Sequence, residues 1–340
     1  MNSEEGSPDD PAAHNGWNPP SARRNGLRET ANRLILTSDG RFQLFCATLA
    51  FSAVAIFAWV VGYLIEGSFP VLDSMGYRFF TGSTWSFNQE VFGALPFIGG
   101  TLYTSAVAMM IAVPISVGIA IFISEIAPRW IGTPLGFLVE MLAAVPSVVF
   151  GIWGIFTLRG FMRDQVEPFL QGSLGFLPFF EGRTFGIDKL SAAVILAIMI
   201  IPTISAISRD ALKAVPTSQK EAALALGVTR YEMIGTVALS YARSGIFGAA
   251  VLGLGRAVGE TMAVTMVIGN VNSFSWSLLD PGQTLSSLIA TNWWEAPSGT
   301  VQQSALIGVG LVLFVLMLAI NVVGRVMLGR VTKVGRVRVE

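Results

Sequence analysis

Long stretches without a charged side chain constrain most strongly how this chain can fold. Four of them lie at 42–65, 91–124, 190–208 and 304–324. Each can supply the roughly 20 apolar residues that cross about 30 Å of hydrocarbon as a helix. Two further apolar stretches carry embedded charges, and these are 131–156 with Glu140 and 244–270 with Arg256 and Glu260. With 52% apolar and 13% charged residues, the chain is predicted to be an all-α integral membrane protein with six transmembrane helices.

Positive charges are distributed unequally between the two sides of these spans. Sixteen Lys and Arg residues fall on the side of the termini, in 1–41, 124–130, 208–243 and 325–340. Five fall on the opposite side, in 66–96, 157–189 and 271–303. Because cytoplasmic loops carry the excess of Lys and Arg, both termini and the 208–243 loop are predicted to be cytoplasmic.

The composition divides the chain into three parts. Residues 1–41 form a polar N-terminal tail that is expected to be largely disordered, residues 42–324 hold the six spans, and residues 325–340 form a basic C-terminal tail. Aromatic residues within 66–90 fit either a belt at the membrane interface, which we favour, or a small extracytoplasmic cap. Pro146 predicts a kink in the third span, and a long external loop is expected over 157–189.

Residue counts argue against several classes of site. Cys46 and His14 are the single cysteine and histidine, so a disulfide, a thiolate metal cluster and a Ser-His-Asp triad are not expected. The sequence lacks the phosphate-binding pattern G-x-x-x-x-G-K-[ST], and it has no basic patch with interleaved aromatic residues for nucleic acid. We therefore expect no enzyme activity, and no metal, cofactor or nucleotide bound by this chain itself.

Segment 218–240, in the predicted cytoplasmic loop, is dense in helix signals. Two capping-box patterns with a glycine between them occur there: Ser218 with Glu221, then Gly227, then Thr229 with Glu232. They predict a helix over 218–226, a glycine stop and a second helix. The first helix is mainly Ala and Leu around one acid, and its smooth face suits a groove in another protein. The alternative is an ordinary polar loop that happens to be helical.

Arg256 and Glu260 are the residues of the sequence that most strongly indicate a functional site, because both are charged and lie within an apolar span. If the fifth span leaves the cytoplasm near Ser244, a rise of about 1.5 Å per residue puts them about 18 Å and about 24 Å deep. Charges at such depth cost several kcal/mol unless they are paired or face water. Their spacing of four favours pairing on one helical face, and Glu140, about 14 Å deep, is a second candidate partner for Arg256. Either the pair fixes helix packing, or the planar guanidinium binds an oxyanion.

The cytoplasmic segment resembles the EAA motif of ABC-transporter permeases. The resemblance rests on Glu221-Ala222-Ala223, Gly227, Val237 and Leu239. In that family the loop carries a coupling helix received by the ATPase subunit, which implies ATPase coupling through Glu221, Ala222, Ala223 and Gly227. The family pattern usually ends in Leu-Pro, whereas this chain has Leu239-Ser240, so the proline break before the next span is missing.

Four segments together resemble the PstC family of permease subunits of phosphate ABC importers: 92–102, 144–154, 208–227 and 253–264. This resemblance implies a type I ABC importer permease fold in the plasma (inner) membrane. It also implies a second homologous permease subunit, two ATPase copies that bind ATP and Mg, and an extracytoplasmic phosphate-binding protein as partners. In that family the residues matching Arg256 and Glu260 are implicated in phosphate movement.

Hydrogen phosphate carries one P–OH proton that sulfate lacks. We hypothesise that Arg256 stabilises the oxyanion while Glu260 accepts that proton, so that sulfate meets an unpaired carboxylate. One alternative is a permease for another oxyanion, such as sulfate, molybdate or phosphonate. The other is an ion-gradient-driven carrier without an ATPase, which the EAA loop and the single set of six spans disfavour.

Overall fold

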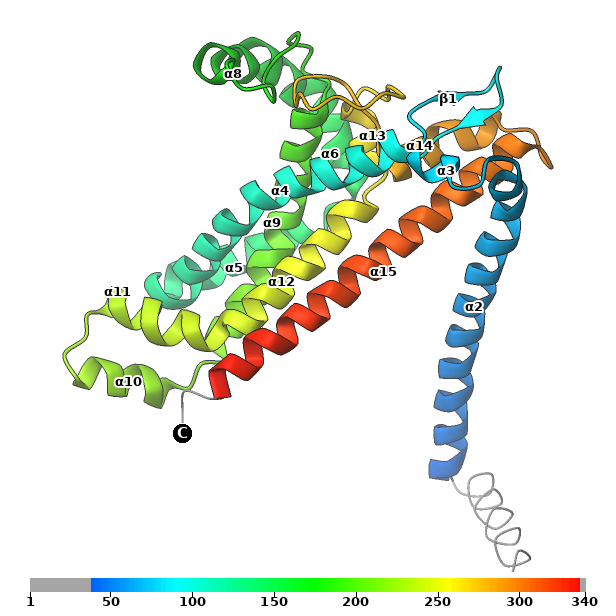
Figure 1. Ribbon diagram of the computed structural model, residues 1–340. Coiled ribbons are helices and arrows are strands. Elements are labelled where there is room, and N and C mark those ends of the chain that lie inside the picture. Colours follow the sequence, from blue (N-terminus) through cyan, green and yellow to red (C-terminus); the bar gives the residue numbers. More distant parts are fainter. Residues whose placement is uncertain (1–37, 337–340) are drawn as a thin grey trace, which may run out of the picture. The chain divides into compact units, whose positions relative to one another are not determined.

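The computed structural model describes residues 38–336, which are mostly helical. They fall into two compact units, with the boundary between Tyr63 and Leu64. The first unit contributes the N-terminal part of helix α2 (Ser38–Met75), and the second contains the remaining elements drawn in Figure 1. The disorder predicted for the N-terminal tail concerns residues that lie almost wholly outside the described range.

Five helices among residues 38–336 are long and apolar enough to cross a membrane, and a bent helix pair supplies a sixth crossing if it counts as one span. Three of the five are single helices: α2, α9 (Lys189–Lys213) and α15 (Val301–Arg336). A fourth consists of α4 (Leu95–Ile121) and the π-helical turn η1 (Phe122–Ile126). The fifth consists of α11 (Arg230–Met233), the π-helical turn η4 (Ile234–Ala238) and α12 (Leu239–Gly259). The all-α membrane fold is therefore confirmed. Helix α15 also runs on into the segment predicted as a C-terminal tail.

The third predicted span is not one straight helix. Helix α5 (Arg129–Ala143) ends before Pro146, and α6 (Ser147–Trp153) starts after it in a direction bent by 89°. Proline lacks an N–H and disfavours helical geometry in the preceding residue, which accounts for a break where only a kink was expected. The chain then stays helical through η2 (Gly154–Leu158), α7 (Arg159–Phe161), η3 (Met162–Val166) and α8 (Glu167–Leu174). The first half of the predicted 157–189 loop is thus helix.

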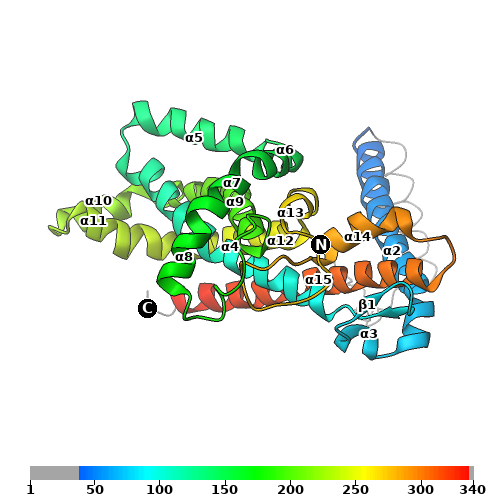
Figure 2. The same ribbon diagram turned by 90° about the horizontal axis from the view of Figure 1, so that it is seen from above.

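Helix α9 forms the centre of the second unit. It packs along both α4 and α12, and these helices run side by side in Figures 1 and 2. Small side chains permit this close approach, because Ala108 and Ala112 of α4, Ala197 of α9 and Ala249 of α12 all belong to one buried cluster. Helix α9 is therefore largely shielded by its neighbours, and Ser191, Ser205 and Ser208 are buried along it.

Aromatic side chains form a small packed layer at one end of the helices, around α3 (Arg78–Thr81), the hairpin β1 (Trp85–Ser86) and β2 (Val91–Phe92), and α14 (Leu285–Asn292). The strands pair antiparallel, with Trp85 opposite Phe92. Phe79, Trp85 and Phe92 are buried, and the Trp85 and Phe92 ring centroids lie 5.0 Å apart. Phe79 and Trp85 therefore belong to a compact cap, and the favoured interpretation of the 66–90 aromatic residues as an interfacial belt is wrong for these two.

Candidate functional site

Arg256 lies in the last turn of α12, next to α9. Its Nη1 donates a hydrogen bond of 2.9 Å to the hydroxyl oxygen of Thr203 on α9. Both side chains are half-buried. Within residues 38–336, no carboxylate oxygen lies within the 4.0 Å that defines an ion pair with this guanidinium. Since a guanidinium has five N–H donors, most of them remain available to an anion.

Glu260 does not pair with Arg256, contrary to the prediction. Helix α12 ends at Gly259, and Glu260 is extended, with φ −69° and ψ 128°. Its Oε1 instead accepts a hydrogen bond of 3.3 Å from the backbone N–H of Ala263, in the first turn of α13 (Met262–Val267). Pairing at a spacing of four requires an unbroken helix. The break separates the two side chains and ends the fifth span eleven residues before the predicted boundary at 270.

Glu140 is also not a partner of Arg256. Its Oε1 accepts a bond of 2.6 Å from Nη2 of Arg209, near the end of α9. The Arg209 side chain is 12% exposed and lies against Gly136, where an added Cβ would come within 2.6 Å of the guanidinium. Glu140 therefore joins α5 to α9. The depth of a residue along its helix does not determine which helical faces meet, and Glu140 meets Arg209 and not Arg256.

Hydroxyl side chains surround the break that follows α12. The Ser286 hydroxyl donates a bond of 2.8 Å to the backbone carbonyl of Glu260, and the Thr284 hydroxyl oxygen lies 3.1 Å from that of Ser286. Both belong to the start of α14, which lies inside the predicted external loop 271–303 and is capped by Thr284 and Ser287. That Thr-x-x-Ser spacing was the sequence signal for this helix, and it went unrecognised.

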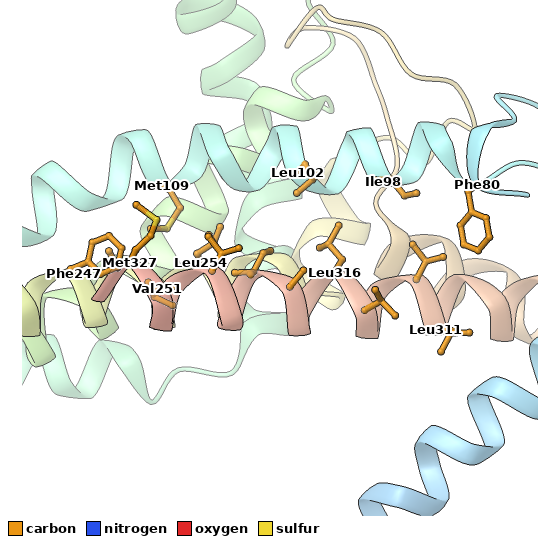
Figure 3. A pocket seen from close by; sticks show the side chains of 17 residues that line it. Phe80, Ile98, Leu102, Met109, Phe247, Val251, Leu254, Leu311, Leu316 and Met327 are labelled. Atoms are coloured by element: carbon orange, nitrogen blue, oxygen red, sulfur yellow. The ribbon is translucent and has the colours of Figure 1, made fainter. Parts of the chain in front are cut away.

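One cavity of the second unit is lined without any charged side chain. It measures about 840 Å³ and lies between α4, α12 and α15, where only apolar side chains and glycine line it. Figure 3 shows Met109, Val251 and Leu316 among the side chains that point into it. No group of three or more His, Cys, Asp or Glu residues that could hold a metal occurs within the described 38–336. Arg256 and Glu260, which were predicted to lie on the substrate path, are not among the residues that line this cavity.

The second candidate site is helix α10 (Thr217–Ala225), in the loop predicted to be cytoplasmic. Its predicted start is wrong, because Pro216 occupies the N-cap position and the Ser218 capping box does not form. The glycine stop is confirmed, since Gly227 has φ +84°, a conformation that favours glycine. The second capping box is confirmed between Thr229 and Glu232. Helix α10 and α11 lie at the end of the bundle opposite α14 (Figure 1).

Much of the α10 surface is open to a partner. Glu221 and Ala222 are exposed, and Leu226 and Tyr231 are 84% and 77% exposed. Exposed apolar side chains next to a short Ala-rich helix form a surface that another protein can cover. From Arg230 onward the chain is continuously helical to Gly259. The fifth span therefore starts before the predicted residue 244, and the missing proline after Leu239 is consistent with this continuity.

Two contacts fix α10 and α11 to η1, at the C-terminal end of α4. Oε1 of Glu125, in η1, accepts a bond of 2.6 Å from Nζ of Lys220 on α10. The backbone carbonyl of Glu125 accepts a bond from Nη2 of Arg230, the first residue of α11. A cavity of about 420 Å³ adjoins these three residues. Glu125 was missed in the sequence because nothing near it in the chain indicates its partners.

Comparison with known proteins defines the class to which this arrangement belongs. Residues 116–333 match the family described as binding-protein-dependent transport system inner membrane component. The chain belongs to this family, and it is a multi-pass membrane permease subunit. A bacterial ABC transporter crystallised with an alginate-bound periplasmic protein shares the fold, with a TM-score of 0.59 at 16% identity over 86% of this chain and 96% of the other.

Within the family, the chain is similar to proteins named phosphate transport system permease protein PstC. It is 43% identical to the one from Xylella fastidiosa over 85% of this chain and 90% of that protein. It is 41% identical to the one from Mesorhizobium japonicum, over 91% and 95%. A probable PstC from Methanocaldococcus jannaschii is 35% identical over 85% and 93%. The similarity thus extends over most of each chain.

Proposed function

We propose that this chain is the permease subunit of an ATP-driven phosphate importer and forms half of the translocation path. The observation that carries the proposal is the similarity to phosphate permeases from bacteria and an archaeon over at least 85% of the chain. The half-buried guanidinium of Arg256 supports it, because a planar fork of donors suits an oxyanion. No observation specifically favours another oxyanion or an ion-gradient-driven carrier.

The complete transporter would contain a second homologous permease, two ATPase copies and an extracytoplasmic phosphate-binding protein. ATP and Mg would bind to the ATPase copies, and this chain would receive their motion through α10. Glu221, Ala222, Ala223 and Gly227 would form or shape the contact surface. The positive-inside distribution favours cytoplasmic termini and a cytoplasmic α10, the side on which ATP is available.

Arg256 would stabilise the phosphate oxyanion during passage, and the Glu260 carboxylate would accept a hydrogen bond from its P–OH group. Glu140, which is bound to Arg209, would shape the path only indirectly by holding α5 against α9. Opening the path alternately to each side would then require movement of α9 and α12, which carry Thr203 and Arg256.

The proposal is tested by phosphate uptake into vesicles that hold the complete complex, with wild type beside Arg256→Gln. Arg243→Gln is the matched control, because it removes the same charge from α12 near the cytoplasmic end. We expect uptake to collapse in Arg256→Gln while assembly and ATP hydrolysis persist, and to persist in the control. A wild-type complex that accumulates sulfate in preference to phosphate would overturn the substrate assignment. Normal uptake by Arg256→Gln would overturn the role of the arginine.

A further inference from the structure

We propose that Glu125 is the positioning residue that makes α4 follow the movement of helix α10. This inference rests on the proposed coupling of α10 to an ATPase. Glu125 lies in η1, the π-helical turn that ends α4, and is 7% exposed. A buried carboxylate needs a partner of opposite charge, and Lys220 of α10 supplies it at 2.6 Å.

Glu125 thereby contacts both α10 and α11. The Glu125 side chain binds Lys220, while its backbone carbonyl binds Arg230 at the start of the fifth span. Apolar packing reinforces this junction, since Ala120 of α4 and Met233 of α11 share a buried cluster against which Ala223 of α10 packs. The Lys220 side chain is only 18% exposed. Water therefore competes less with this ion pair than with one at an open surface.

Two routes connect α10 with the contact between Arg256 and Thr203. Along the chain, α10 leads into α11 and the fifth span, which carries Arg256. Through Glu125, α10 also holds α4, and α4 packs along α9. The buried Ser116 hydroxyl of α4 donates a bond of 3.2 Å to the carbonyl of Ile201 on α9, two residues before Thr203. Displacement of α10 would thus move both helices that hold the Arg256–Thr203 contact.

Without the Glu125–Lys220 pair, movement of α10 would still displace the fifth span, but α10 could move without displacing the end of α4. Movement of α10 would then no longer be transmitted through α4 to α9, so Thr203 would not move together with Arg256. ATP hydrolysis would continue while the path opened less often. The expected defect is therefore in coupling, which differs from a loss of ATPase binding or a loss of folding.

The test uses the complete complex in vesicles and measures phosphate accumulated per ATP hydrolysed. Glu125→Gln keeps the size of the side chain and the backbone carbonyl but removes the charge, and Lys220→Gln removes the partner. We expect this ratio to fall about fivefold or more in both variants. Lys220→Arg, which retains an ion pair, should keep at least half of the wild-type ratio. Lys213→Gln is the control, because it removes an exposed ammonium at the end of α9.

Wild-type ratios in both Glu125→Gln and Lys220→Gln would overturn the inference, and if Glu125→Gln fails to assemble, Lys220→Gln decides. If wild type hydrolyses ATP but takes up no phosphate, the proposed substrate fails. In that case the role of the Glu125–Lys220 pair is tested by measuring hydrogen exchange of the backbone amides of α4. ATP should alter that exchange in wild type but not in Lys220→Gln, and equal changes in both would count against Glu125. A chain that binds no ATPase would overturn both proposals.

Discussion

The guanidinium of Arg256 on α12 donates a 2.9 Å hydrogen bond to the hydroxyl of Thr203 on α9. This bond links α9 and α12, which pack along each other, and the Arg256 guanidinium has further N–H donors beyond the one it uses. A long, flexible side chain loses entropy when it is held in one rotamer. The Thr203 hydroxyl restricts the guanidinium in advance, so that less ordering is needed when an anion arrives.

Replacing Thr203 with Val should therefore weaken phosphate transport without removing the arginine. Val keeps the branched shape and replaces the hydroxyl that accepts the Arg256 bond with a methyl group. A hydrogen bond to a charged group contributes roughly 1.5–3 kcal/mol, so we expect uptake at limiting phosphate to fall by about tenfold. Thr203→Ser, which retains a hydroxyl, should stay near wild type. Equal uptake by the Val and Ser variants in assembled complexes would show that the contact does not prepare Arg256.

Glu260→Gln should change the choice between anions. Its amide oxygen can still accept from the Ala263 N–H, so the start of α13 should survive while the negative charge is lost. Sulfate would then no longer meet a repulsive carboxylate, and the ratio of sulfate to phosphate uptake should rise by about tenfold or more. Competition between the two labelled anions in vesicles measures this ratio. Reduced phosphate uptake with unchanged discrimination would instead favour a purely structural role.

Gly227→Val should separate ATP hydrolysis from transport. The φ of +84° at Gly227 is strained for a β-branched residue by about 1–2 kcal/mol, so the end of α10 must shift. Glu221→Lys should have the same effect, because it reverses an exposed charge on the proposed contact surface. Gly235→Ala is the control, since Gly235 is helical and its Cβ would meet open space. Wild-type uptake by Gly227→Val and Glu221→Lys would contradict the coupling role of this helix.

Local features of the fold were predictable from the sequence, and contacts distant in sequence were not. Apolar runs reveal spans because solvation acts on each stretch separately, and the Thr229 capping box and the Gly227 stop involve only a few consecutive residues. By contrast, Glu140 binds Arg209 across 69 positions, and Glu125 binds Lys220 across 95. Such pairs depend on which helical faces meet, and a helical repeat along one segment carries no information about that.

The break after α12 illustrates the same limit inside one motif. Arg256 and Glu260 have the spacing of a helical pair, yet the hydroxyl of Ser286, 26 positions away, binds the Glu260 carbonyl. The Ala263 N–H binds the Glu260 carboxylate. Together these bonds satisfy groups that an uninterrupted helix would have paired internally. The mutual geometry of Arg256 and Glu260 therefore depends on α14, which lies in a stretch that was predicted to be a loop.

A buried pair of acids at the N-terminus of α9 adds a prediction about pH. Asp188 caps this helix, and its Oδ1 accepts from the Ser191 N–H at 2.7 Å. Asp188 and Glu167 are both 0% exposed, and each has one carboxyl oxygen for which residues 38–336 supply no hydrogen-bond donor. Burial, together with the neighbouring Glu167 carboxyl, raises the pKa of Asp188 to about 8. Lys189, which follows Asp188, and Asp280 are the other charged groups close by.

The sign of the pH effect follows from this raised pKa. Between the ordinary value of 3.8 and about 8, folded Asp188 keeps a proton that the unfolded chain releases. The contribution of Asp188 to the free energy of unfolding is therefore full below pH 3.8 and is lost as pH rises to about 8.

We expect the thermal unfolding temperature of the purified wild type to decrease as pH rises from about 5 to about 8. Asp188→Asn, whose amide keeps an acceptor for Ser191, should show a flatter profile, and Asp73→Asn, which alters an exposed acid, should behave as wild type. Parallel profiles for wild type and Asp188→Asn would mean that folded Asp188 is already ionised at neutral pH and that its burial is compensated by another charge.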